Sequence, residues 1–470
     1  MPEYKESKLF ASVPVNRAIV KLAVPAVLSQ IILVAYNMAD TLFIGLTGSD
    51  SMITAVTICM PAFMFLSAFS NLFGIGGGSA ISRMLGKKDP QTASRISSFA
   101  FWACVLVTVL YALGSYLLAD PFVDLLGGRH PEVHGLAKEY LFWTVTCFGL
   151  CASVSTLLSH LVRSEGHALQ ASIGIMFGGV MNILLDPLFM FVILPPGHEI
   201  LGAAVATSLS NLLAVLYYLV FILTISRKKK TILSIHPGSI RLSGKIIGEI
   251  FISGLPACLM TLFENISFMI LDNLMQINGI VMQAGLGVAK KINMLSHSIV
   301  RGVTQGVLPL IAYNYGSRDH KRMYSAFYRS ASASCILALI CMAAYLLFSR
   351  FFVGLFIQSE SDSILYGAQF LRLLCIGCPF SALAYAIISF FQATKQGGKA
   401  LLVALSRKGW LDIPLMFILQ RIDPVRGIVS ATPIADVLCC ILAVVLFLFF
   451  VRALKLERIV LSDPDADLQP

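Results

Sequence analysis

The residues best suited to chemistry are two aspartates that lie inside long apolar runs, Asp40 and Asp186. Tyr36 lies four residues before Asp40 and Asn182 four residues before Asp186, so each pair shares one helical face. Two carboxylates close together in a low dielectric favour retention of a proton by one of them. With oxygens from Asn182 and Thr207 they also make an oxygen-only ligand set for a cation such as Na+. The pattern predicts a proton or sodium site; the alternative is a satisfied interhelical hydrogen-bond network.

A second group of carboxylates lies in the later apolar runs, and Glu264 stands out among them. It follows the helix-breaking Pro256 by eight residues, which places it near the middle of a membrane span. A lone desolvated carboxylate there is expected to favour proton exchange over sodium binding. Asp412 has Lys408 four residues before it, a spacing that favours a structural ion pair. The other acids of this group are Asp272 and Asp436.

Three cations lie in the same region, Lys290, Lys291 and Arg301. Lys290 and Lys291 are expected to line a cleft, to pair with Glu264 or Asp272, or to extend towards water, and the sequence leaves these alternatives open. The run Gly74-Ile-Gly-Gly-Gly78 superficially resembles a phosphate-binding loop, but it lies inside an apolar run. Close helix packing or flexibility is the favoured interpretation of these glycines.

The elements that carry these residues must span a membrane. Hydrophobic residues make up 57% of the 470, charged residues 13%, and the mean hydropathy is +0.82. So little polar surface excludes a water-soluble enzyme. Twelve apolar runs are expected to cross the bilayer, several of them long enough to require tilt or bending. They lie near residues 18–43, 51–82, 96–119, 138–161, 168–194, 200–225, 247–275, 280–309, 328–357, 364–392, 399–420 and 427–452.

Enzymatic chemistry is not expected. The chain has no Gly-x4-Gly-Lys-Ser/Thr loop for ATP, and its eleven cysteines lie mostly singly in apolar runs. No His/Cys metal set and no nucleophile with a spaced base is apparent, so we expect no cofactor beyond a coupling ion, H+ or Na+.

Basic residues predict the orientation. They cluster in the N-terminal segment, in the even-numbered loops and after the last run, whereas the first, fifth and seventh loops carry no Lys or Arg. Examples are Lys5 in the N-terminal segment, Arg83, Lys87 and Lys88 in the second loop, and Lys229, Lys230 and Arg241 in the sixth. By the positive-inside rule both termini are cytoplasmic. The net charge of +10 follows from this topology, so a nucleic-acid partner is not expected.

The two halves of the sequence repeat. Pro25 in AVPAVL and Pro256 in GLPACL are 231 residues apart; GKKD at 86 returns as GSRD at 316, and GAAVAT at 202 as GIVSAT at 427. An even number of spans per copy makes the copies parallel repeats. We therefore expect an all-α polytopic membrane protein with twelve helices in two six-helix lobes. The expected divisions are an N-lobe at 1–225, a cytoplasmic linker at 226–245, a C-lobe at 246–455 and a tail at 456–470.

These residues resemble a known family. LAVPAVLSQIILVAYNMADTLFIG, GSAISRMLGKKD, NILLDPLFMF and GLPACLMTLFENISF are similar to segments of the multidrug and toxic compound extrusion (MATE) family, in particular its MepA-like and DinF-like bacterial members. The resemblance covers about residues 15–455 and implies cation-driven export. It also implies ion-coupling roles for Asp40, Asn182, Asp186, Thr207 and Glu264. A tenth-helix aspartate of the NorM-like branch has no counterpart in 378–392.

Two functions follow as expectations. The first is a bacterial inner-membrane antiporter, acting as a monomer, that exports organic cationic or amphipathic compounds in exchange for H+ or Na+. The residues expected to meet its small-molecule substrate are Tyr36, Asp40, Glu264 and Lys291. The second is a flippase for a lipid-linked or anionic substrate, which the cations of 280–309 would attract.

Overall fold

The structure is a computed structural model that describes residues 8–126, 130–228, 231–240, 243–356 and 362–462. Every regular element in these ranges is helical. Lys5, Lys229, Lys230, Arg241 and the part of the expected tail after 462 lie outside the described residues. In the first half of the chain the elements are α1 (Lys8–Ala11), α2 (Val15–Leu46), α3 (Asp50–Gly86), α4 (Pro90–Leu117), α5 (Ala119–Leu126), α6 (Pro131–Leu141), η1 (Phe142–Cys147), α7 (Gly149–Ser164), α8 (Ala168–Leu188), η2 (Phe189–Ile193) and α9 (Glu199–Arg227).

A connecting segment with one short helix, η3 (Pro237–Ser239), leads to the second half of the chain. The helices of the second half are α10 (Gly244–Gln276), α11 (Ile280–Gly316), α12 (His320–Gly354), α13 (Asp362–Cys375), α14 (Cys378–Ala393), α15 (Gly397–Leu405), η4 (Ser406–Trp410), α16 (Asp412–Gln420) and α17 (Arg426–Ser462).

Eight of the described helices are long and apolar enough to cross a membrane: α2, α3, α4, α8 with η2, α9, α10, α12 and α17. Two further spans form if each bent pair of helices counts as one, which gives up to ten. Two of the expected runs instead coincide with α11 and with α15–η4–α16. Their charged residues, such as Lys290 and Lys408, lower the local hydropathy.

Bending, expected from the long runs, is present. The chain turns by 47° between Cys147 and Gly149 and by 44° between Cys375 and Cys378. In each pair the two helices follow one another directly along the chain, so each pair is one apolar run interrupted by a bend.

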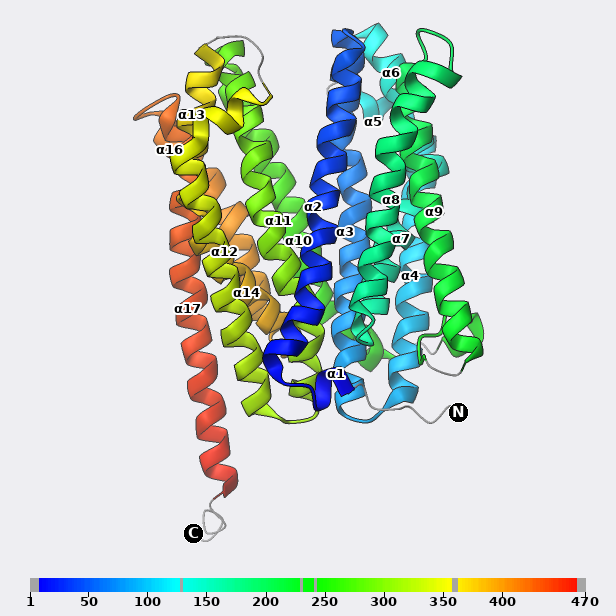
Figure 1. Ribbon diagram of the computed structural model, residues 1–470, viewed down its shortest axis with the longest axis vertical. Coiled ribbons are helices and arrows are strands. Elements are labelled where there is room, and N and C mark those ends of the chain that lie inside the picture. Colours follow the sequence, from blue (N-terminus) through cyan, green and yellow to red (C-terminus); the bar gives the residue numbers. More distant parts are fainter. Residues whose placement is uncertain (1–7, 127–129, 229–230, 241–242, 357–361, 463–470) are drawn as a thin grey trace.

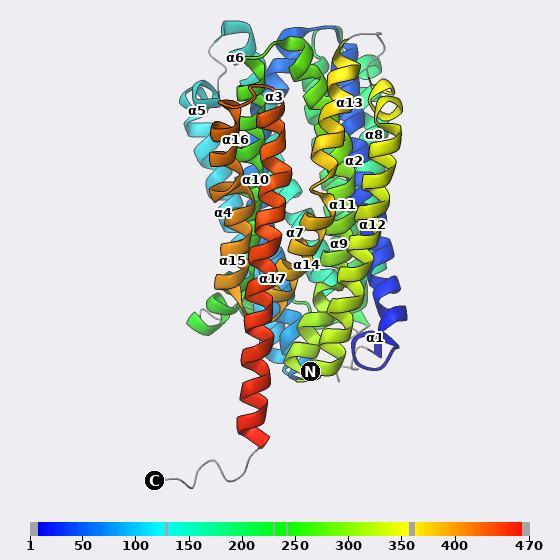
Figure 2. The same cartoon turned by 90° about the vertical axis from the view of Figure 1, so that its left-hand side faces the viewer.

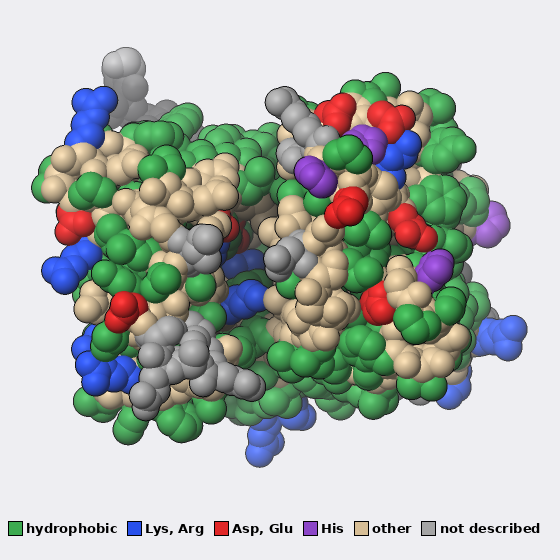
Figure 3. Space-filling view, turned by 90° about the horizontal axis from the view of Figure 1, so that it is seen from above, with side chains coloured by type: hydrophobic (Ala, Val, Ile, Leu, Met, Phe, Trp, Pro, Cys, Tyr) green, Lys and Arg blue, Asp and Glu red, His purple; other side chains and the backbone are tan. Residues whose placement is uncertain are grey.

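The two halves stand side by side, with α2–α9 on the right and α10–α17 on the left in Figure 1. Both termini lie at the lower end, which we call the basic end; the opposite end we call the open end. Figure 2 shows the second half in front, with α16 and α17 on one side of a gap above α14 and α13 on the other, and the space-filling view from the open end shows a hollow between the two halves, with Lys and Arg side chains inside it (Figure 3).

Glycines close the two halves together towards the basic end. A Cβ on Gly76 of α3 would lie 2.4 Å from the carbonyl oxygen of Ile250, and one on Gly254 of α10 only 1.9 Å from that of Leu72. Further along α3, a Cβ on Gly86 would meet the Tyr313 oxygen of α11 at 2.0 Å. The helices can therefore approach only because these positions lack side chains. The prediction that the 74–78 glycines serve helix packing is confirmed.

Arg83 joins the halves at the same level. Sequence reasoning assigned it to a basic loop, but it lies in the last turn of α3 and its side chain is 1% exposed. Its Nη2 donates to Glu249 Oε2 of α10 at 3.0 Å, and its Nη1 donates to the Gln392 carbonyl oxygen at 3.0 Å. Lys395 also pairs with Glu249. A buried, hydrogen-bonded ion pair thus spans the contact between the halves.

The repeat seen in the sequence has a structural counterpart. Lys88 and Arg318 are both in the left-handed region, with φ of 60° and 62°. Each is followed by an aspartate that caps the next helix: Asp89 Oδ1 accepts from Thr92 N, and Asp319 Oδ1 accepts from Arg322 N, both at 2.9 Å. GKKD and GSRD therefore form the same turn.

Candidate functional site

The first candidate site joins α8 and α9 towards the open end of the first half. Asn182 Nδ2 donates to Asp186 Oδ1 at 3.2 Å and to Thr207 Oγ1 at 3.2 Å. Asp186 is 0% and Asn182 2% exposed, whereas Thr207 is half-buried. The four-residue spacing within α8 and the adjacent position of α9 thus bring together three residues that the sequence grouped.

Asp40 of α2 completes this set. Its carboxyl group is half-buried and lies close enough to that of Asp186 for the two to interact electrostatically. Tyr36, one turn earlier on α2, also interacts electrostatically with both carboxyl groups. No ion pair involving Asp40 or Asp186 occurs among the described residues. We call Asp40, Asn182, Asp186 and Thr207 the acid site.

Three buried oxygens of the acid site have no hydrogen-bond partner among the described residues: Asp40 Oδ1, Asn182 Oδ1 and Asp186 Oδ2. All three accept hydrogen bonds and none can donate while the carboxyl groups are ionised. An unsatisfied buried acceptor is costly, and an ionised one more so. A proton on one carboxyl group, or a cation among the oxygens, removes this cost. The residue types therefore suit H+ or Na+.

Two further residues, Tyr140 and Lys291, interact with the acid site, although neither was among the residues predicted to couple ions. Tyr140 of α6 is 8% exposed and interacts electrostatically with Asp40 and Asp186. It lies just before the irregular η1 segment, and no spacing in the sequence ties it to the aspartates. Lys291 of α11 faces Asp40 from the second half and is exposed. Of the alternatives left open for Lys291, an ion pair with Glu264 or Asp272 is not found among the described residues.

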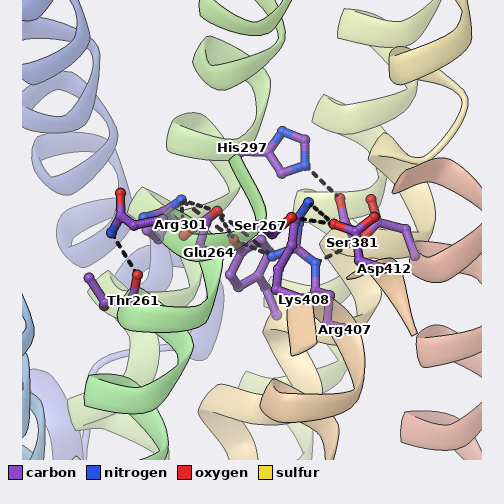
Figure 4. A network of polar contacts seen from close by, with 12 residues as sticks. Thr261, Glu264, Ser267, His297, Arg301, Ser381, Arg407, Lys408 and Asp412 are labelled. Atoms are coloured by element: carbon purple, nitrogen blue, oxygen red, sulfur yellow. Dashed lines mark hydrogen bonds and ion pairs between the residues drawn. The ribbon is translucent and has the colours of Figure 1, made fainter. Parts of the chain in front are cut away.

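Glu264 is the centre of a different arrangement, in the second half (Figure 4). No second carboxylate contacts it among the described residues, as the sequence predicted, but cations surround it. Arg301 Nη2 lies 3.2 Å from Glu264 Oε1, the Tyr385 hydroxyl donates to the same oxygen at 3.2 Å, and Arg407 Nη1 lies 3.9 Å away. The cause is α11 and η4, which carry arginines from distant parts of the sequence against α10. The charge of Glu264 is therefore stabilised by cations, contrary to the expectation that it favours proton exchange.

The carboxylates of this second arrangement each have a lysine or arginine partner. The predicted pair of Lys408 with Asp412 is confirmed, at 2.8 Å, and Lys290 pairs with Asp272. Arg407 Nε lies 2.8 Å from Asp436 Oδ1 and its guanidinium stacks over the Tyr385 ring at 4.4 Å. We call the four pairs the ion-pair network; they are Lys290–Asp272, Arg301–Glu264, Lys408–Asp412 and Arg407–Asp436.

The repeat relates the two arrangements. Asn182 and Asp412 are 230 residues apart and Thr207 and Thr432 are 225 apart, the spacings seen between the repeated motifs. The Thr432 hydroxyl donates to Asp412 Oδ1 at 3.0 Å, as Thr207 contacts Asn182. In the second half, however, the Lys408 ammonium binds the carboxylate. The Lys408 side chain therefore supplies a cation at the position in the second half that corresponds to the acid site.

The expected ion-coupling residues do not form one cluster. Asp40, Asn182, Asp186 and Thr207 lie together, whereas no hydrogen bond or ion pair between described residues links Glu264 to them. Within the described ranges no three His, Cys, Asp or Glu side chains gather as a metal centre. Arg407 was missed at the sequence level, although a cation inside an apolar run is a usable signal.

A family model described as MatE matches the chain twice, at residues 25–188 and 256–418. The chain belongs to the MatE family. The two matches begin at Pro25 and Pro256, the prolines that mark the sequence repeat, and together they cover more than half of the chain. With its several apolar helices, the chain is a multi-pass membrane protein.

Named relatives agree with this assignment. The chain is 28% identical over 446 residues to the multidrug export protein MepA of Staphylococcus saprophyticus, covering 94% of this chain and 95% of that one. It is 26% identical to MepA of Staphylococcus aureus strain MSSA476, with the same coverage.

Solved structures share the fold. A MATE protein in complex with MaD3S superimposes with a TM-score of 0.88 at 23% identity, over 96% of this chain and 99% of that one. A transporter of the MOP superfamily from Pyrococcus furiosus, described by a reversed polarity of its binding pocket, gives a TM-score of 0.85 at 24% identity with the same coverage.

Proposed function

We propose that this MatE-family protein is a secondary antiporter that exports organic, cationic or amphipathic compounds in exchange for H+ or Na+. One observation carries the proposal: no described cation forms an ion pair with either aspartate of the acid site, while the four carboxylates of the ion-pair network each have such a partner. The family assignment and the MepA relatives support the same activity.

The architecture proposed for this activity has twelve spans in two six-helix lobes related as parallel repeats. It counts α11 and α15–η4–α16 as spans, because their charged residues face one another rather than lipid. The repeated turns at Lys88 and Arg318 support two equivalent copies. The basic end is placed in the cytoplasm of a bacterial cell by the positive-inside rule. The protein works as a monomer in the inner membrane.

Exchange follows from competition within the cleft. A cationic compound and the coupling ion both neutralise the acid site, so tight binding of one weakens binding of the other. In the repeat of this site the Lys408 ammonium already neutralises the carboxylate of Asp412. This internal comparison supports a cation at the acid site, because the same backbone arrangement satisfies its oxygens in the second half by a positive charge.

The second candidate function is a flippase for a lipid-linked or other anionic substrate. Lys291 favours it, because this ammonium group is exposed on the cleft and attracts anions. The Pyrococcus furiosus structure shows that reversed pocket polarity is known on this fold. The network contributes less, since each of its four cations is already paired.

Transport by the reconstituted protein distinguishes the two candidate functions. Proteoliposomes loaded with a cationic dye are given a Na+ gradient at constant pH, or a pH gradient without Na+. We expect an imposed gradient of one of these ions to drive dye movement. No dye movement under either gradient, together with movement of a lipid-linked sugar, would establish the flippase instead.

A further inference from the structure

A small cavity lies where α3 and α7 of the first half meet α11 of the second, away from the acid site. Its polar lining consists of Ser79, His160, Arg163 and Gln305. The space available to the centre of a water molecule is about 10 Å³, so the cavity holds about one water molecule or one monatomic ion.

Arg163 lines this cavity without a counter-ion. Arg163 is 2% exposed, and neither its Nε nor its Nη2 has a hydrogen-bond partner among the described residues. The two nitrogens form one edge of the guanidinium, the edge that binds an anion with two parallel hydrogen bonds. Arginine stays protonated in proteins, so it cannot escape burial by losing its proton. A buried, unpaired guanidinium is strongly unfavourable unless something accepts from it.

The rest of the lining also offers donors. Ser79 is 0% exposed, and its Oγ has no partner within the described part of the chain. Gln305 presents an amide and His160 an imidazole, and no carboxylate lines the cavity. A site with several donors, a fixed positive charge and no acid is selective for an anion.

The repeat shows that the turn itself does not need this charge. Arg163 and Gln392 each lie three residues before a residue in the left-handed region, Gly166 with φ of 96° and Lys395 with φ of 63°. The second half thus makes the same turn with a neutral side chain. A structural role in closing the turn therefore does not explain the arginine.

We propose that Arg163 and Ser79 bind a small monovalent inorganic anion of the size of chloride, between the two halves. Arg163 supplies the charge and two donors, and Ser79 supplies a hydroxyl donor. Gln305 of α11 lies across the junction from them. Since the cavity exists only while α11 contacts α3 and α7, the bound anion favours the conformation that is closed at the basic end.

Direct binding tests this proposal on the full-length protein in detergent. We measure equilibrium binding of radioactive chloride at fixed Na+ and pH, with gluconate replacing unlabelled anion. The wild type is expected to bind about one chloride per chain saturably. Arg163→Gln, which introduces the residue of the second repeat, is expected to lower the affinity about tenfold or more, and Ser79→Ala by less.

A matched serine serves as control. Ser334 of α12 is also 0% exposed with an unpartnered Oγ, but it does not line the cavity, so Ser334→Ala is expected to leave chloride binding unchanged. If a variant fails to fold, crystals of the wild type soaked in bromide decide: an anomalous peak beside Arg163 supports the proposal. Absence of both saturable chloride binding and this peak would show that water fills the cavity, and would overturn it.

Discussion

Asp40 and Asp186 differ from the other acids of the membrane helices in what surrounds them. Glu264, Asp272, Asp412 and Asp436 each contact a lysine or arginine within 3.2 Å, whereas Asp186 accepts a hydrogen bond from Asn182 and interacts electrostatically with Asp40. In the proposed function the same residue type therefore has two roles: the paired acids hold helices in place, whereas the unpaired acids exchange a proton or ion.

Replacing Glu264 by glutamine tests this division. The variant leaves the Arg301 and Arg407 charges less compensated, so we expect a loss of stability on the order of 2 kcal/mol. Ion dependence of transport is expected to persist, because the acid site is intact. Thermal unfolding in detergent and dye efflux across a sodium series measure the two effects.

The double variant Glu264→Gln with Arg301→Gln is the control for charge. It restores neutrality and should recover part of the lost stability. Loss of Na+ or pH stimulation in a well-folded Glu264→Gln protein would show that the coupling ion binds in the second half.

The sequence predicted the candidate residues but not their partners. A carboxylate inside an apolar run is expensive, so Asp40, Asp186 and Glu264 could be selected without a structure. Helical spacing also predicted contacts between near neighbours, such as Asn182 with Asp186 and Lys408 with Asp412. The contacts of Glu264 with Arg301, Tyr385 and Arg407 join helices 37 to 143 residues apart. No periodicity specifies such contacts.

Among the elements, the turn between α7 and α8 couples the first half to the connecting segment. Glu165 in this turn is 6% exposed; it accepts from the Thr231 hydroxyl at 2.6 Å and from Ile232 N at 2.7 Å. Burial outweighs these hydrogen bonds and raises the pKa of Glu165 to about 7. The folded protein therefore binds a proton here more tightly than the unfolded chain does.

This shift predicts a pH dependence. Because the folded-state pKa is above the ordinary value of 4.5, the stabilisation is complete below pH 4.5 and is lost as the pH rises through about 7. Between pH 5 and 8 the wild type should lose on the order of 1–3 kcal/mol relative to Glu165→Gln, which keeps a neutral side chain. Unfolding in detergent across this pH series measures the difference.

An exposed acid gives the comparison for this series. Glu132→Gln changes a surface side chain on α6 and should follow the wild type at every pH. Parallel curves for wild type and Glu165→Gln would contradict the assignment of the pH effect to this turn.

Element boundaries were predictable where apolar runs end in polar turns, as at 168 and 280, which begin α8 and α11. The breaks inside elements were not. The irregular segments η1 and η4 lie inside predicted spans, and hydropathy does not distinguish a bent helix from a straight one.

For the whole molecule, the repeat predicted two equivalent halves, but only the structure shows which end they close. Contact depends on glycine pairs such as Gly76 with Gly254 and on Arg83 with Glu249, all towards the basic end. The sequence predicted that Arg83 lies in a loop, because a basic residue near the end of an apolar run is usually exposed to water. At the opposite, open end the molecule is hollowed between the two halves (Figure 3).

The central claim, that the acid site couples ion entry to export, is tested most directly by Asp40→Asn in proteoliposomes. The substitution keeps the side-chain size and removes one of two unpaired charges, so the protein should fold normally. Dye efflux driven by the effective ion gradient is measured beside Asp124→Asn, which changes an exposed aspartate of α5. We predict that Asp40→Asn abolishes gradient-driven efflux and Asp124→Asn retains it; wild-type efflux by well-folded Asp40→Asn would contradict the account.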